Sequence, residues 1–379
     1  MNLNDDQQMI RNMVRDFAEE QIRPGVQKRD EEERFIEELL PGLAELGLLG
    51  MIIPEEYGGS GLGTVSYALA IEELARVCPS TAVTVSVTNS VCQEPILRFG
   101  SEEQKKRFLP PLASGIEIGG FALTEPGAGS DAASIKTRAE KKVDRYILNG
   151  QKAWITNTHY GKTFVVFAVT DPGAGSRGIT AFIVRGDTPG LHFDPPEKKM
   201  GLHASVTSGI TFDDCEVPAG NVLGEEGMGI KIAFATLDAS RIGIAAQSVG
   251  IAQGALDEAV KYAGQRETFG RPLKAHQAVQ LSLADMATEI EAARLMTHKA
   301  ASMRDAGDPD LARAASMAKL YASETAKKVC DAAVQIHGAY GFSREYAVER
   351  FYRDVRVTTI YEGTSEIQRI VIARALLSE

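Results

Sequence analysis

The spacing of apolar residues changes twice along this chain of 379 residues, and those changes limit the folds open to it. Near the start, Ile10, Val14 and Phe17 recur with a period close to that of an α-helix. From Ile116 onward, short segments such as FVVFAV and ITAFIV are rich in β-branched and aromatic residues and are separated by Gly, Pro, Asn and Asp. Such segments predict a small all-β domain, either a barrel or a sandwich. Helical periodicity then returns in four segments, about 230–265, 275–306, 308–338 and 364–378.

The predicted fold class is therefore α+β and multidomain. We expect an all-α N-terminal domain over 1–115, a central β-domain over 116–226 and a C-terminal four-helix bundle over 227–379. Ser101 and Gln104 are spaced as a capping box at the start of one helix in the first domain.

Composition excludes several classes of function. The formal charge of -10 argues against a nucleic-acid partner, which needs clustered Lys and Arg. The sequence has no apolar run long enough for a membrane span, and its acidic start, MNLNDDQQ, resembles neither a secretory signal nor a transit peptide. Four widely spaced cysteines and isolated histidines predict neither disulfides nor a metal site. A cytoplasmic protein is the expectation.

Two motifs of the β-region suit a cofactor. FALTEPGAGSD, residues 121–131, combines glycines with hydroxyl donors, and glycine lets backbone N–H groups approach a ligand closely. A plain polar β-turn explains it equally well. KAWITN, residues 152–157, holds the only tryptophan, Trp154. A single tryptophan more often fills a core, although on a strand beside the first motif it could cover an aromatic cofactor.

Two motifs of the helical region suit a phosphate. RETFGRPLKAHQ, residues 266–277, joins two long helices, and Arg266 could hold a phosphate with both ends of its guanidinium group. QIHGAYGF, residues 335–342, is a helix end with glycines. Ordinary solvated turns remain the alternative for both.

The segment YEGTSEIQR places Glu362 just before a predicted helix. An acidic residue there favours a helix N-terminus, and Ser365 with Gln368 fits a capping box. The functional alternative is a general base, which requires an apolar, water-poor site that raises the carboxyl pKa. The local pattern leaves both interpretations open.

In this order and spacing, the motifs FALTEPGAGSD, KAWITN, LDASRIGIAAQSVG, RETFGRPLKAHQ, QIHGAYGF and YEGTSEIQR resemble the acyl-CoA dehydrogenase family along the whole chain, with short-chain, butyryl-CoA-type bacterial members most similar. The resemblance implies FAD-dependent formation of a trans-2-enoyl-CoA, with electrons passed to an electron-transferring flavoprotein, in a homotetramer that is a dimer of dimers. It also implies that Glu362 removes the α-proton while its backbone N–H and a flavin hydroxyl stabilise the enolate.

The resemblance further assigns binding residues, position by position. Those implied for FAD are Phe121, Leu123, Thr124, Gly129, Ser130, Trp154, Ile155, Thr156, Arg266, Phe269, Gln277, Gln335, Ile336, Gly338, Ala339, Thr364 and Glu366, the set from 266 to 339 serving a neighbouring subunit's cofactor. Those implied for the acyl-CoA are Ser130, Asp238, Arg241, Tyr361, Gly363 and Arg374.

Some positions bear on rival functions. Ser240 stands where some relatives place their base, so Glu362 has no rival; Ala82 stands where glutaryl-CoA enzymes carry arginine. Flavin monooxygenases and desulfinases of this scaffold tend to lack the glutamate, and a DNA-associated relative would need a basic groove. A branched or cyclic acyl group remains an alternative, because Gln93 and Glu94 are polar residues near the expected acyl pocket; they are more simply read as structural. Ala339 and His337 depart from the usual family residues.

Overall fold

The computed structural model describes residues 3–377, and its N-terminal part is helical, as the apolar period predicts. Asn4 caps the first helix through a capping box with Gln7, and Ser101 and Gln104 form the predicted second box. The two helices over residues 64–77 and 79–87 are buried on nearly every side. The helices of this part are α1 (Asp5–Phe17), α2 (Val26–Glu31), α3 (Leu40–Glu45), α4 (Thr64–Val77), α5 (Pro79–Val87), α6 (Glu94–Phe99) and α7 (Glu102–Ala113).

The middle part is an eight-stranded sheet whose strands run in the order β6-β7-β3-β2-β4-β5-β8, with β1 paired to β4. The path is open from β6 to β8, so the barrel alternative is wrong for the described strands. A single residue pair, Arg138 with Val169, joins the half that contains β3 and β7 to the half that contains β4 and β5. The strands are β1 (Gly119–Ala122), β2 (Arg138–Lys141), β3 (Arg145–Thr156), β4 (Thr163–Val169), β5 (Ile179–Arg185), β6 (Leu191–Phe193), β7 (Thr207–Pro218) and β8 (Val222–Leu223).

Strand β4 shows why the sheet is apolar on both faces. Phe164 and Val166 point into a core shared with β3, β5 and β7, so the two halves pack as a sandwich. Val165 and Phe167, the alternate residues, pack against α6, α7 and the start of α8. The helices therefore hold the sheet against the N-terminal end of α8.

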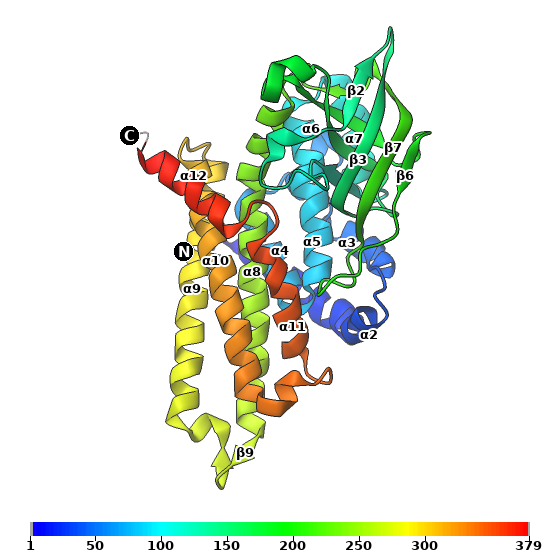
Figure 1. The fold of residues 1–379 in the computed structure, drawn as a ribbon. Helices are drawn as coiled ribbons and strands as arrows, with labels where there is room; N and C mark the ends of the chain where they lie inside the picture. The colour runs from blue at the N-terminus through cyan, green and yellow to red at the C-terminus, as the bar shows by residue number, and fades with distance from the viewer. Residues whose placement is uncertain (1–2, 378–379) are drawn as a thin grey trace.

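The C-terminal part is built on long helices, with α8, α9 and α10 running side by side and α11 and α12 packed against them (Figure 1). Their ends lie within a few residues of the predicted ones, except that residue 378 of the last predicted segment lies outside the described residues. Helix α11 was not predicted. The helices are α8 (Gly229–Gln265), α9 (Gln277–Asp305), α10 (Leu311–His337), α11 (Ala347–Val355) and α12 (Ser365–Leu377); the hairpin of β9 (Glu267–Thr268) and β10 (Arg271–Pro272) joins α8 to α9.

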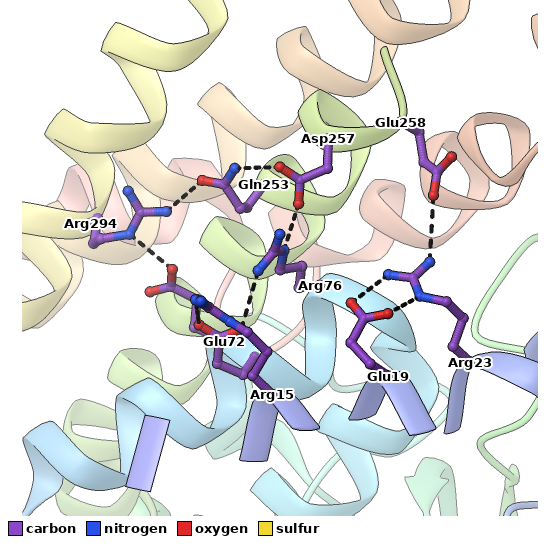
Figure 2. Close-up of polar contacts among 10 residues, drawn as sticks. Arg15, Glu19, Arg23, Glu72, Arg76, Gln253, Asp257, Glu258 and Arg294 are labelled. Atoms are coloured by element: carbon purple, nitrogen blue, oxygen red, sulfur yellow. Dashed lines mark hydrogen bonds and ion pairs between the residues drawn. The ribbon is translucent and has the colours of Figure 1, made fainter. Parts of the chain in front are cut away.

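Charged side chains tie the N-terminal helices to the C-terminal ones (Figure 2). Glu72 of α4 accepts a hydrogen bond of 2.8 Å from Nε of Arg294 on α9. Arg76, one turn further along α4, contacts Asp257 of α8 at 2.5 Å. Glu72 is buried, so the loss of its arginine would leave a charge without compensation.

Gln93 and Glu94 both make structural contacts, Gln93 within the N-terminal part and Glu94 with the C-terminal part. The Gln93 amide donates to the carbonyl oxygens of Leu49 and Thr88, at 2.6 and 3.2 Å. The Glu94 carboxylate lies 2.7 Å from Arg304 at the end of α9. Both polar residues are therefore structural, in keeping with the simpler of the two interpretations.

Several general properties follow from the described residues. All four cysteines there are buried free thiols. None of the helices within residues 3–377 combines the length and the apolar composition needed to cross a bilayer. Over the same residues, no three His, Cys, Asp or Glu side chains are grouped so that they could hold a metal ion.

Candidate active site

Glu362 lies in a strained turn immediately before α12. Its φ is 51° and that of Gly363 is 93°, so a non-glycine residue occupies the left-handed region. Two side chains hold the turn in place: the ammonium group of Lys319 donates to the carbonyl oxygen of Gly363 at 2.8 Å, and the amide of Gln368 donates to the carbonyl oxygens of Glu362 and Gly363. The strain is thus supported by buried groups from α10 and α12.

The predicted capping box at α12 is wrong. Thr364, one residue earlier, caps the helix by accepting a hydrogen bond from the Ile367 N–H. The Ser365 hydroxyl instead donates to Glu324 of α10 at 2.6 Å. Gln368, the other predicted member, is the residue that braces the Glu362 turn.

The carboxylate of Glu362 is directed at α8. The Ser240 hydroxyl lies 2.5 Å from its Oε2 atom, and no other hydrogen bond to this carboxylate exists within residues 3–377. Desolvation raises the pKa of Glu362, while Ser240, Lys319 and Arg241 oppose that rise. The side chain is half-buried, so it combines a desolvated carboxylate with access for a ligand.

Asp238 and Arg241 lie on α8, on either side of Ser240 in the sequence. Arg241 is buried, and its Nη1 donates to Asp238 at 2.6 Å and to Ser316 at 3.0 Å. The buried Nε of Arg241 has no acceptor in the described structure. Arg241 therefore acts on Glu362 through its charge, and Asp238 is connected to it only through its bond to Arg241.

Tyr361, also predicted for the substrate, packs beside the turn. Its hydroxyl donates to the side-chain oxygen of Gln247 on α8. Burial raises its pKa well above the usual range, so the phenol stays neutral. Arg374 is exposed on α12, in the same helix as the exposed Glu366.

The glycine-rich turn after β1 is built on a buried ion pair that the motif analysis missed. Lys152 of β3 is fully buried, and its Nζ contacts Glu125 at 2.8 Å and the Leu123 carbonyl oxygen at 3.1 Å. Glu125 also accepts the N–H groups of Lys136 and Thr137. Burial lowers the pKa of Lys152 to about 8.

The outer side of this turn is open. A Cβ atom placed on Gly127 or Gly129 would meet nothing within 4 Å. The N–H groups of Gly129 and Ser130 have no acceptor within residues 3–377, and both residues are exposed. By contrast, Leu123 is buried and Phe121 half-buried, so their side chains serve mainly the core. The backbone of the turn is the part that can meet a ligand.

Trp154 is 60% exposed, with a φ of 61°, where the pairing of β3 with β7 is irregular. The core-filler interpretation is therefore wrong. The Ala153 N–H donates to the Thr124 carbonyl oxygen at 2.9 Å, which places the indole beside the glycine-rich turn. Ile155 is buried in the sheet and Thr156 half-buried. An exposed indole beside free N–H donors fits a flat aromatic cofactor such as FAD.

The remaining predicted cofactor residues form a second group at the opposite end of α8, around the hairpin of β9 and β10 (Figure 1). Phe269 is 96% exposed, and the Arg266 guanidinium lies 5.6 Å from the centre of the Tyr340 ring. The other exposed members are Gln277, Gln335, Gly338 and Ala339, with Ile336 half-buried. His337, by contrast, is buried and stacks on Tyr262 at 4.2 Å.

Helix α8 separates the two groups of predicted cofactor residues, the one at the glycine-rich turn and Trp154 from the one around the hairpin of β9 and β10. It has 37 residues, and the distance from Arg241 to Arg266 along it is on the order of 40 Å. The chain therefore does not bring all the predicted cofactor residues together. The two groups fit two different copies of the cofactor, as expected where subunits share their sites.

Comparison with known proteins gives consistent matches over the whole chain. Residues 4–116, 120–215 and 227–377 match the families described as the N-terminal, middle and C-terminal domains of acyl-CoA dehydrogenase. The short-chain specific acyl-CoA dehydrogenase of Rattus norvegicus is 50% identical, over 98% of this chain and 90% of that protein.

Two solved structures are similar throughout. The butyryl-CoA dehydrogenase of Megasphaera elsdenii has a TM-score of 0.98 and 47% identity, covering 100% of this chain and 99% of that one. A chain in a structure of the electron transferring flavoprotein of Acidaminococcus fermentans has a TM-score of 0.99 and 49% identity, covering 100% of both.

Proposed function

Because this chain belongs to the acyl-CoA dehydrogenase family, we propose that it desaturates a short-chain acyl-CoA thioester between Cα and Cβ, with Glu362 as the base. The observation that carries the proposal is the half-buried carboxylate on a braced, strained turn, with Oε2 bonded to Ser240 and Oε1 without a hydrogen bond in the described structure. Oε1 takes the α-proton of the substrate. The raised pKa of Glu362 suits that task.

The backbone of the same turn stabilises the enolate. The Glu362 N–H has no acceptor within residues 3–377, and it donates to the thioester oxygen as negative charge develops there. Lys319 and Gln368 fix the two peptides that follow this N–H, through the carbonyl oxygens of Glu362 and Gly363, so base and donor keep one geometry. Asp238 and Arg241 line the acyl-CoA channel, and the Asp238 contact orients the Arg241 guanidinium there. Gly363 and Tyr361 line the pocket, and Arg374 lies toward the CoA end.

FAD, when bound, supplies the acceptor for the hydride that leaves Cβ. The free N–H groups of Gly129 and Ser130, the Trp154 indole and the end of α12 at Thr364 and Glu366 hold the flavin. Arg266, Phe269, Gln277 and the turn at 335–339 hold the adenine end of a neighbouring subunit's cofactor. The separation of the two groups along α8 supports this sharing. A homotetramer built as a dimer of dimers belongs to the same proposal.

The electrons leave to an electron-transferring flavoprotein, the protein named in the Acidaminococcus fermentans structure. A cytoplasmic location belongs to the same proposal, which the four free, buried thiols support.

The decisive experiment is the Glu362→Gln variant, which keeps the shape of the side chain and removes its basicity. The variant should retain yellow, FAD-loaded protein but lose the bleaching that butyryl-CoA causes, by at least about a thousandfold in rate. Glu103→Gln, at an exposed position of α7, is the matched control and should bleach normally. Near-normal bleaching of the Glu362 variant would refute the proposal. Butyryl, hexanoyl, octanoyl, branched and cyclic thioesters, compared with a dye acceptor, would rank acyl preference.

A further inference from the structure

Ser240 offers its one hydroxyl hydrogen to two acceptors. Its Oγ lies 2.5 Å from Glu362 Oε2 and 3.2 Å from the carbonyl oxygen of Leu237, one turn back on α8. A hydroxyl carries a single hydrogen but two acceptor lone pairs. Only one of these contacts can therefore use the Ser240 hydrogen at a time, and the other must involve a different donor or stay unmade.

The contact with Glu362 Oε2 is available to the Ser240 hydrogen in both protonation states of the carboxyl group. When Glu362 is ionised it can only accept, so Ser240 must donate to it. When Glu362 carries the substrate's proton on Oε1, Oε2 is the carbonyl oxygen of the acid and still accepts, so Ser240 can keep donating to it. The side chain of Ser240 is fully buried, so water does not compete for either position.

We propose that Ser240 is a positioning residue that holds the Glu362 carboxyl group in one orientation both before and after it takes the substrate's α-proton. This inference rests on the proposed function. It assigns Oε2 to Ser240 throughout the reaction and Oε1 to the substrate. No rotation of the carboxyl group is needed on proton transfer, because Ser240 donates to Oε2 before and after Oε1 takes the proton.

Other groups around Glu362 cannot take this role. Lys319 of α10 and Arg241 of α8 act on it through their charges, but Lys319 donates to Gly363 and Arg241 to Asp238 and Ser316. Tyr67 of α4 pairs with Ser86, and Tyr361 donates to Gln247. Ser240 is the one donor to the carboxylate among residues 3–377.

The consequence is a measurable change in the titration of Glu362. Ser240 stabilises the ionised form, so its removal raises the proton affinity of the carboxylate. In Ser240→Ala, the midpoint of Glu362 protonation should move up by roughly one pH unit, a tenfold change in proton affinity. Ser240→Cys keeps nearly the same side-chain volume but offers only a weak donor. In this variant the midpoint of Glu362 protonation should also move up.

Two readouts on the FAD-loaded enzyme test this. The first is the carboxyl C=O stretch in infrared difference spectra against pH, assigned by its absence in Glu362→Gln. The second is the pH profile of bleaching by butyryl-CoA, whose acidic limb should shift to higher pH by the same amount. At pH values above the shifted limb, the bleaching rate of the Ser240→Ala variant should level off roughly fivefold below that of the wild type, because the carboxyl group is less well oriented. Ser248→Ala is the matched control, since this buried serine of α8 bonds only Ile244.

The outcomes separate the two proposals. A shift in both readouts for Ala and Cys, with none for Ser248→Ala, supports the role of Ser240. Unchanged midpoints in the Ala variant, or a wild-type titration in the Cys variant, would overturn it. If the infrared midpoint shifts in the Ser240 variants but no acyl-CoA bleaches the wild-type enzyme, the Ser240 contact is supported and the proposed function is overturned.

Discussion

The ammonium group of Lys319 donates a 2.8 Å hydrogen bond to the carbonyl oxygen of Gly363, the residue that follows the proposed base. Lys319 is fully buried on α10, and desolvation lowers its pKa to about 8. A buried lysine is costly, and here its one hydrogen bond braces the strained turn that carries Glu362. The contact therefore connects the middle of the helical bundle to the catalytic geometry.

Lys319→Met should keep most of the side-chain volume and lose this brace. We expect kcat with butyryl-CoA to fall roughly tenfold to a hundredfold, because small displacements of a catalytic group have effects of that size. FAD content should stay close to that of the wild type, since within residues 3–377 Lys319 hydrogen-bonds only Gly363 and acts on Glu366 through its charge alone. Lys328→Met, at an exposed position of the same helix, is the control and should turn over normally. Steady-state rates measure kcat, and flavin absorbance measures the FAD content. A Lys319 variant with the kcat of the wild type would contradict the bracing role.

Trp154 gives a direct report on cofactor binding because it is the only tryptophan of the chain. The indole is mostly exposed, so Trp154→Leu should leave the melting temperature of the FAD-free protein within about 2 °C of the wild type. FAD affinity should fall roughly tenfold from the loss of stacking. In the wild type, added FAD should quench the tryptophan fluorescence. Unquenched fluorescence at saturating FAD would place the flavin elsewhere.

The Glu125–Lys152 pair supports the glycine-rich turn from beneath. Lys152→Met would leave the buried Glu125 carboxylate without its cation, and such a loss typically costs about 3–5 kcal/mol. The double variant with Glu125→Gln should recover part of that loss, since no charge then remains buried. Thermal unfolding of the wild type, the Lys152→Met variant and the double variant, followed by circular dichroism, measures their order of stability. A single variant as stable as wild type would show that the pair contributes little.

The order of helices and strands could be predicted from the sequence because each part shows its own apolar period. Even the ends of α8, α9 and α10 are close to the predicted ones. Helix α11 was missed because it is short, with only nine residues. The open state of the sheet could not be predicted, because it depends on whether the edge strands β6 and β8, which are distant in sequence, pair with each other.

The candidate site was predictable only in part, for a related reason. The exposed glycines and Glu362 belong to recognisable motifs. Lys319 and Lys152, however, act through partners 44 and 27 residues away in sequence, and no local pattern marks such a pairing. The cap of α12 shows the same limit, because Glu324 of α10 takes Ser365 and leaves Thr364 to cap the helix.

His298 of α9 should make the protein sensitive to acid. It is buried 3.8 Å from Glu72, and burial lowers its pKa to about 4, below the ordinary value of 6.5. Between these values the unfolded chain binds a proton that the folded protein does not, so stability falls as the pH drops from 6.5 toward 4. The full loss from this residue is about 3 kcal/mol. His298→Gln stays neutral, so its melting temperature should fall less steeply over this range, whereas His192→Gln, exposed on β6, should track the wild type. Parallel curves for His298→Gln and wild type would show that another group controls the acid response.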